Sequence, residues 1–260
     1  MNRFIDTHSH IFDEKFDEDR EQAVFRAKEN GVDRLIIPSI DSSTHQKVLD
    51  CCSKWEGCYP AIGLHPTDVK ANYLEELEIV KSYVDKYYEK LVAIGEIGLD
   101  LYWSDEFYAE QIEALNFQIE LALKYNKPVI IHSRDAFENI EEQLHKYEGR
   151  GLKVISHGYS SDIDQYNRFE AMDCEFLYGI GGVVTFKKSL IPQFVEQIPL
   201  SKIVLETDCP YLSPTPNRGK RNESAFIPII AQKIAEIKGV TIEEVAKITT
   251  NNVENFFNII

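Results

Sequence analysis

The segment MNRFIDTHSH places two histidines, His8 and His10, directly after a short apolar run. Side chains on an extended strand alternate between its faces, so residues two apart point the same way. Two neutral imidazoles directed at one point form an arrangement that binds metal ions. A pair of surface histidines would have the same spacing, so the pair alone does not decide between the two interpretations.

Polar residues also follow five further apolar segments. Four of these segments end near a histidine or an acidic residue: GLHP contains His65, LVAIGEIGLD contains Glu96 and then Asp100, PVIIHSR contains His132 and Arg134, and LKVISHGY contains His157. The last segment, KIVLETDCP, contains Glu206 and Asp208 on one face. Five of the seven histidines therefore lie at strand-like ends, whereas His45 and His145 fall on helix-like segments and are interpreted as surface residues.

A single histidine or carboxylate at a strand end is usually a structural residue with a hydrogen-bond partner. Several of them buried together without a cation would repel one another or stay unpaired, at a cost of several kcal/mol. Four imidazoles and two carboxylates could instead hold two divalent ions about 3.5–4 Å apart, with one carboxylate bridging them. Mixed nitrogen and oxygen ligands suit Zn²⁺ or Mn²⁺ better than Ca²⁺, and Mg²⁺ usually takes fewer nitrogens.

The segments between these residues predict an alternation of strands and helices. Short Val-, Ile- and Leu-rich runs predict strands at 3–8, 34–40, 59–64, 91–98, 128–132, 153–157, 175–180 and 203–206. Amphipathic stretches predict helices at 18–30, 74–88, 105–125 and 136–147, and a capping sequence at Thr241 predicts a last helix over 241–257 that closes the barrel. This pattern is typical of an α/β protein, a single-domain (β/α)₈ TIM barrel over residues 1–260, with an open doubly wound sheet as the alternative. In such a barrel the polar groups meet at the C-terminal ends of the strands, where we expect the metal site.

Composition narrows the classes of function. The formal net charge of −15 disfavours broad binding to duplex nucleic acid, although a local basic patch could still bind a strand. Neither a dinucleotide-binding nor a phosphate-loop motif occurs, so we expect no nucleotide cofactor. Five cysteines without a CxxC pair predict reduced, structural thiols. The chain contains no long apolar run and its start does not resemble a signal peptide, so we expect no membrane association and a cytoplasmic location.

Taken together, FIDTHSH, GLHP, GEIGLD, PVIIHSRDA, ETDCPYLSP and the RGKRNE run resemble the TatD family of metal-dependent deoxyribonucleases, within the amidohydrolase-like barrels. The resemblance implies that His8 and His10 bind one metal, that Glu96 bridges, that His132 and His157 hold the second metal, and that Asp208 is a ligand that also handles protons. Asp208 and Glu96 are then the catalytic carboxylates. The family usually has HCFSG where this chain has His157-Gly158-Tyr159-Ser160-Ser161, which affects expected substrate contacts but not the ligand.

The residues and the resemblance together predict a hydrolase that uses metal-activated water, with two divalent ions per chain (Zn²⁺, Mn²⁺ or Mg²⁺). The expected substrate is DNA, digested from the 3′ end as single strands. Five residues are expected to bind it: His65, Arg134, Arg218, Lys220 and Arg221. Phe186 and Tyr211 could stack on bases or pack structurally. Two alternatives remain, a dinuclear amidohydrolase or esterase acting on a small molecule or on aminoacylated RNA, and a metal-stabilised scaffold that binds nucleic acid without cutting it.

Overall fold

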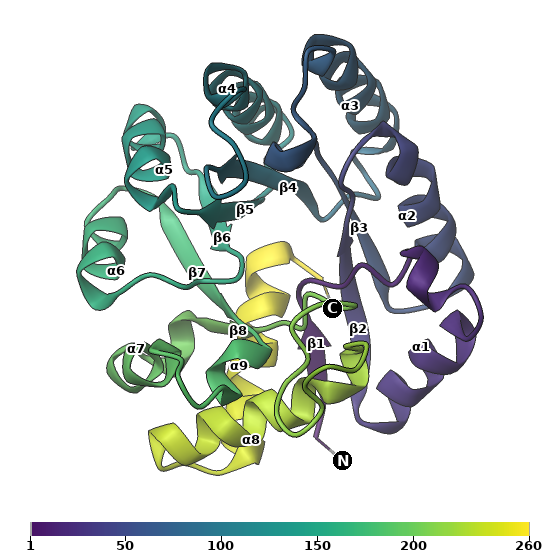
Figure 1. Cartoon of the computed structure of the whole chain (residues 1–260), viewed down its shortest axis with the longest axis vertical. Coiled ribbons are helices and arrows are strands. Elements are labelled where there is room, and N and C mark those ends of the chain that lie inside the picture. Colours follow the sequence, from purple (N-terminus) through teal and green to yellow (C-terminus); the bar gives the residue numbers. More distant parts are fainter. Residues whose placement is uncertain (1, 260) are drawn as a thin grey trace.

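The computed structural model describes residues 2–259, and its strands form one parallel sheet in sequential order that curves into a nearly closed barrel (Figure 1). The strands are β1 (Phe4–Asp6), β2 (Val32–Pro38), β3 (Cys58–Ile62), β4 (Ala93–Asp100), β5 (Val129–Arg134), β6 (Lys153–Ser156), β7 (Glu175–Ile180) and β8 (Ile203–Leu205). The predicted (β/α)₈ barrel is therefore confirmed, and the open doubly wound alternative is wrong.

Helices surround the barrel and alternate with the strands (Figure 1). They are α1 (Arg20–Glu29), α2 (Ser42–Lys54), α3 (Tyr73–Tyr87), α4 (Tyr108–Lys124), α5 (Phe137–Leu144), α6 (Ile163–Glu170), α7 (Ile191–Gln197), α8 (Ile227–Lys238) and α9 (Ile242–Phe257). The predicted helix start at Thr241 is confirmed, because the Thr241 hydroxyl accepts a hydrogen bond from the Glu244 amide. Within residues 2–259, no helix combines the length and the apolar composition needed to cross a bilayer.

The interior of the barrel has its own apolar core, distinct from the core between sheet and helices. Every strand contributes one buried small or aliphatic residue to it: Ile5, Ile36, Ala61, Ala93, Ile130, Ile155, Leu177 and Val204. Phe256 and Phe257 at the end of α9 pack in the same cluster, beside residues where β3 and β4 begin. The helix α9 thus fills the N-terminal end of the barrel, which leaves the C-terminal ends of the strands for polar side chains.

Contacts of the buried Asp6 hold the segments after β1 and β8 together. Its carboxylate accepts hydrogen bonds from the backbone amide and the hydroxyl of Thr207, at 2.9 and 2.6 Å, and from the amide of His8 at 3.2 Å. The Asp208 amide in turn donates to the carbonyl of His8 at 2.9 Å. These bonds join the two ends of the sheet and fix His8 and Asp208 relative to each other.

The expectation that His45 is a surface residue is wrong. The side chain of His45 is fully buried on the inner face of α2, where its ring meets the Tyr83 ring edge-on at 5.1 Å. Neither ring nitrogen has a hydrogen-bond partner within residues 2–259. Burial lowers the pKa of His45 to about 4, so the ring is neutral in the folded protein. His145, in contrast, is exposed as expected.

We expect His45→Phe to reduce the loss of stability on acidification. The pKa of His45 is about 4 when folded and 6.5 in its reference state, so protonation favours the unfolded chain. The contribution of the neutral ring is complete above pH 6.5 and is lost as pH falls towards 4, by up to about 3 kcal/mol. Phenylalanine keeps a ring against Tyr83 but cannot be protonated.

The measurement is the free energy of unfolding by urea at pH 7.5 and pH 5, for the parent protein and for the variant. The gap between the two pH values should narrow in His45→Phe. Substitution of the exposed histidine, His145→Gln, is the matched control. An equal narrowing in that control would contradict the assignment to the buried ring.

Candidate metal centre

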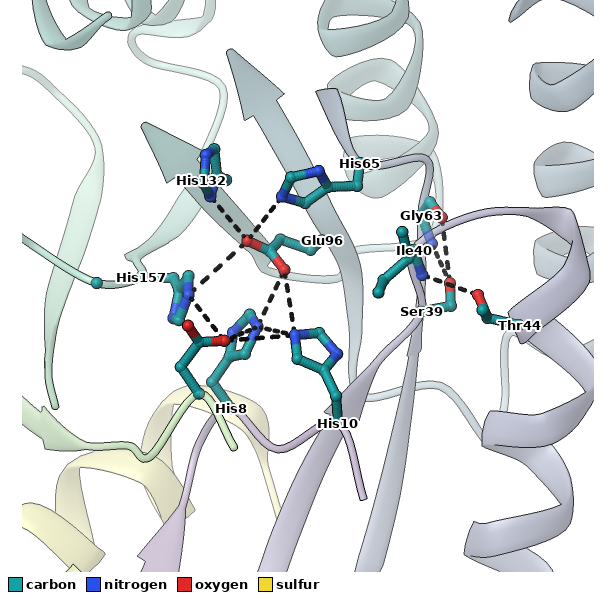
Figure 2. A network of polar contacts seen from close by, with 12 residues as sticks. His8, His10, Ser39, Ile40, Thr44, Gly63, His65, Glu96, His132 and His157 are labelled. Atoms are coloured by element: carbon teal, nitrogen blue, oxygen red, sulfur yellow. Dashed lines mark hydrogen bonds and ion pairs between the residues drawn. The ribbon is translucent and has the colours of Figure 1, made fainter. Parts of the chain in front are cut away.

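The carboxylate of Glu96 lies at the centre of a cluster of imidazoles at the C-terminal ends of the strands (Figure 2). Its Oε1 atom is 3.1 Å from Nδ1 of His132, 3.4 Å from Nε2 of His65 and 3.8 Å from Nε2 of His157. Its Oε2 atom is 3.0 Å from Nε2 of His8 and 3.7 Å from Nε2 of His10. One carboxylate therefore reaches two separate groups of nitrogens, as a bridging ligand must.

The structure brings His8 and His10 together, as their spacing predicts. Their Nε2 atoms lie 3.1 Å apart, and both rings are buried. Between them, the backbone of Ser9 pairs with Cys209 and so continues the contact between β1 and β8. The two side chains flanking Ser9 consequently point to the same side, towards Glu96.

Asp208 and His157 complete the cluster on the side away from β4. Oδ1 of Asp208 lies 3.5 Å from Nε2 of His10 and 3.9 Å from Nε2 of both His8 and His157. The Asp208 side chain is 22% exposed, whereas that of Glu96 is 3% exposed. Of these two carboxylates, Asp208 is thus the one that can exchange a proton with water entering the site.

Glu206 orients His157 and does not face the centre of the cluster. Its Oε2 atom lies 2.9 Å from Nδ1 of His157, and its Oε1 atom accepts a hydrogen bond from the Gly158 amide. Gly179 on β7 makes room for this carboxylate, because a Cβ atom there would lie 2.0 Å from Oε2. Through this contact at Nδ1, Glu206 fixes the orientation of the His157 ring, so that Nε2 points towards Glu96 and Asp208.

Asp100 holds His132 in the same way, a role for Asp100 that the sequence pattern does not predict. Its Oδ2 atom lies 2.8 Å from Nε2 of His132, and both it and Glu96 are buried. A signal was available, because Glu96 and Asp100 are four residues apart on β4 and therefore share a face. Gln111 fixes the end of β4, because its side-chain oxygen accepts a hydrogen bond from the backbone amide of Asp100.

His65 is closer to the cluster than a peripheral substrate contact would be. Its Nδ1 atom accepts a hydrogen bond from the Thr67 amide at 3.1 Å, at the start of a short 3₁₀ helix (Pro66–Asp68). Its Nδ1 atom also lies 2.7 Å from the Thr67 hydroxyl, and its Nε2 atom faces Glu96. Thr67 therefore holds the His65 ring with Nε2 directed at the cluster.

The backbone around Glu96 is held by the ends of β2 and β3. The Glu96 amide donates to the carbonyl of Ser39, whose hydroxyl donates to the carbonyl of Gly63 and accepts from the Gly63 amide (Figure 2). Nearby, the Thr44 hydroxyl accepts from the Ile40 amide at 2.9 Å. These bonds fix the position of Glu96 without using its carboxylate.

The charges in the cluster are strongly coupled. Burial alone would raise the pKa of Glu96, but the surrounding imidazoles, His8 foremost, hold it well below its usual range. Burial would lower the pKa of His132 and His157, yet the carboxylates raise it, to about 9 for His132 beside Asp100 and about 10 for His157 beside Glu206. Burial and the neighbouring His157 lower the pKa of His8 to about 4. The carboxylates thus stay ionised and require positive charge close by.

The donor set fits divalent cations. Three trios have ligand atoms that all lie within 4.8 Å of one another: His8, Glu96 and His157; His8, His10 and Asp208; and His65, Glu96 and His132. Imidazole nitrogens with carboxylate oxygens, and no cysteine, are typical of open catalytic sites and not of closed structural zinc sites. A cation would also give the Nε2 atoms of His8 and His10, which lie 3.1 Å apart, a common partner.

The basic residues expected to bind substrate divide into two groups. Arg134, Arg218 and Lys220 have exposed or partly exposed side chains that form no ion pair within residues 2–259; the guanidinium of Arg218 lies 3.8 Å over the ring of Phe186. Arg221 differs, because it donates two hydrogen bonds to Asp19 and one to the Lys15 carbonyl. Its charge is offset by an acid distant in sequence, and this ion pair joins the loop to the segment after β1. The phosphate contact expected of Arg221 stays a prediction.

The chain is similar to known proteins over nearly its whole length. A family model described as TatD related DNase matches residues 5–258. The chain is 38% identical to the "Uncharacterized metal-dependent hydrolase YabD" of Bacillus subtilis, over 98% of this chain and 99% of that protein. It is 31% identical to the human "Deoxyribonuclease TATDN3", over 97% and 94%. The crystal structure of YJJV, a TatD homologue from Escherichia coli, superposes with a TM-score of 0.92 at 30% identity, covering 99% of each chain.

We expect Glu206→Gln to weaken metal retention about 10–100-fold, because a partner that orients a ligating histidine usually contributes that much. Glutamine keeps an oxygen for the Gly158 amide but loses the negative charge beside Nδ1 of His157. The measurement is a competition between the protein and a chromogenic chelator. Glu236→Gln on the exposed face of α8 is the control. Unchanged affinity in Glu206→Gln would show that His157 needs no partner.

Proposed function

Since this chain belongs to the TatD family and is a metal-dependent hydrolase, we propose that it is a deoxyribonuclease that digests single-stranded DNA from the 3′ end. Residues 1–260 are proposed to form one hydrolase domain. The observation that carries it is the set of unneutralised cations at the rim of the cluster, in a chain with a net charge of −15. A phosphodiester needs such groups, whereas a neutral amide or lactone does not.

We assign the ligands from the contacts of Glu96. His8 and His10 would hold one ion with Asp208, His132 and His157 would hold the second, and Glu96 would bridge them. Two divalent ions, when bound, lower the pKa of water towards neutrality and offset the charge of the phosphoryl oxygens. The ions would be Zn²⁺, Mn²⁺ or Mg²⁺.

Asp208 is the proposed proton acceptor. Burial would raise its pKa, but the hydrogen bond with His10 and the nearby imidazoles lower it, so the carboxylate is ionised at neutral pH. Its partial exposure lets it receive a proton from the attacking water and return it to solvent. Glu96 is the second catalytic carboxylate, and its position between the two groups of imidazoles makes it the alternative acceptor.

The remaining residues bind and orient the strand. Arg218 and Lys220 are proposed to contact its phosphates from the loop after β8, and Arg134 from the end of β5. The Nε2 atom of His65 would contact either Glu96 or a substrate oxygen close to it. Arg221 is proposed to support the loop through Asp19, which leaves less of its charge for a phosphate.

The proposed function is tested by digestion of 5′- and 3′-labelled DNA, single-stranded and duplex, with each divalent metal in turn. We expect a ladder that begins at the 3′ end of single strands, close to two bound ions per chain by metal analysis, and loss of activity with chelator. Turnover of amides, lactones or aminoacyl esters without cleavage of any phosphodiester would contradict the proposal and favour the small-molecule or aminoacylated-RNA alternative. Tight strand binding without cleavage would favour a scaffold.

We expect Asp208→Asn to reduce hydrolysis about 10²–10⁴-fold, because a positioned general base usually contributes that much. Asparagine keeps one oxygen ligand and the side-chain size, so the fold and much of the metal should remain. Single-turnover rates on a labelled oligonucleotide, together with metal analysis, provide the measurement, and Asp50→Asn on the exposed face of α2 is the control. Near-normal turnover in Asp208→Asn would assign the proton to Glu96.

A further inference from the structure

A cavity of about 590 Å³ lies among the segments that follow the candidate ligands His132 and His157 in the chain. Its walls come from the segments that follow β4, β5 and β6, and from the start of α6. Residues that line it include Tyr102, Arg134, Phe137, Asn139, Ser160 and Ser161. This volume lies within the range of small-ligand sites. The lining combines aromatic surface and hydroxyl groups with two cations, Arg134 and Arg168, and three acidic residues, Asp135, Glu138 and Asp162.

Two exposed aromatic residues and an arginine form a stack at the edge of this cavity. The guanidinium of Arg134 lies 3.6 Å from the centre of the Tyr102 ring and 5.3 Å from that of Trp103. The two rings meet edge to face at 4.9 Å. Trp103 is 71% exposed and Tyr102 is 52% exposed, which leaves large apolar faces in water. Arg134 forms no ion pair within the described part of the chain, so a ring face and a positive charge are both available to a ligand.

The stack is tied to the metal centre through Asp100. One oxygen of Asp100 lies 2.8 Å from Nε2 of His132, and the other accepts a hydrogen bond from the Tyr102 amide at 3.1 Å. Arg134 follows His132 by two residues on β5, and its carbonyl accepts from the Leu101 amide at 3.0 Å. The stack therefore has a fixed position relative to the candidate ligand His132.

The segment Gly158–Ser161, where this chain departs from the usual family sequence, forms another part of the wall. Tyr159 is buried: its ring packs against Phe137 and Phe194, and its hydroxyl donates to the Asp162 carbonyl. It therefore contributes to the core, and Ser160 and Ser161 line the cavity in its place. Ser160 matches the usual family sequence and Ser161 replaces its glycine, so the departure adds one hydroxyl to this wall.

We propose that Tyr102, Trp103 and Arg134 form a subsite for one unpaired nucleotide of the substrate strand, with the base stacked on the exposed Trp103 ring and a phosphate on the guanidinium. The inference rests on the proposed function, which it deepens. Every nucleobase has a face that stacks on an aromatic ring, so this subsite tolerates any sequence. It also selects single strands, because the bases of a duplex are already stacked on each other.

Trp103 offers a direct readout of stacking. The chain has two tryptophans, so Trp55→Phe leaves Trp103 as the only one, and Trp103→Leu in the parent protein gives the background signal. The metal-loaded protein is titrated with two probes. One is a phosphorothioate-linked strand of eight thymidines, which resists hydrolysis, and the other is a base-free strand with the same backbone and charge. We expect the thymidine strand to quench Trp103 fluorescence on saturation and the base-free strand to leave it unquenched.

The affinities of substituted proteins separate base from phosphate. Removing a stacking ring typically weakens binding about 5- to 150-fold per base, so Trp103→Leu should weaken the thymidine strand at least fivefold and the base-free strand less than twofold. Arg134→Gln should weaken both strands and flatten the dependence of log affinity on log salt by about 0.7. Phe25→Ala, an exposed ring on α1, and Arg3→Gln, at the opposite end of the barrel, are matched controls.

Equal quenching by both strands, or equal affinity losses for both in Trp103→Leu, would overturn the base subsite. That outcome leaves the nuclease intact if labelled DNA is still digested. Failure of the proposed function looks different: neither DNA nor a small activated phosphodiester is hydrolysed by the metal-loaded parent protein. Base-dependent quenching in such a protein would retain the subsite as a nucleotide-binding site alone.

Discussion

The burial of the Glu96 carboxylate is the constraint on which the rest of the site depends. An ionised carboxylate that is 3% exposed must have positive charge or several hydrogen-bond donors around it, because desolvation alone costs several kcal/mol. Imidazoles from four other strand ends meet this need, and each must be aimed. Glu206 orients His157 and Asp100 orients His132, so two further buried carboxylates support the imidazoles that surround Glu96. The cluster is consequently rich in acid, and a divalent cation is the group that balances it.

The barrel supplies the geometry that makes such a cluster possible. Parallel strands end at the same side, and the apolar core inside them, closed below by Phe256 and Phe257, keeps the strand ends at fixed separations. The join between β1 and β8 bears directly on the site, since the Asp6 carboxylate connects His8 with Thr207, the residue that precedes Asp208. The proposed ligands of one ion therefore come from both ends of the sheet, His8 and His10 after β1 and Asp208 after β8. The buried Asp6 carboxylate holds these two segments together.

The strand-end pattern made the strands and the convergence of the histidines predictable, because it depends on short apolar runs that are local in sequence. Residues that depend on distant partners were not predictable in this way. Arg221 follows a basic run without acids, yet its partner Asp19 lies 202 residues away. The prediction for His45 is wrong because metal-like partner spacing carries no information on burial. Val48, three residues on, shares its helix face and indicates an inward side. The contacts of Asp100 follow the strand period, but only the structure shows that its partner is His132.

The net charge of −15 and the proposed polyanionic substrate are compatible because screening separates local from global charge. At physiological ionic strength the Debye length is about 8 Å, so acids on the far helices are screened from a strand at the rim, whereas cations in contact with its phosphates are not. Arg134 and Arg218 lie over aromatic rings, which hold a guanidinium in place without neutralising it. An ion pair would hold it equally well and cancel its charge, as Asp19 does for Arg221. At about 0.01 M salt the Debye length grows to about 30 Å and the acidic surface repels a strand before it reaches the rim. The affinity of the proposed substrate strand is therefore expected to have an optimum in salt concentration, where distant acids are screened and contact cations are still effective.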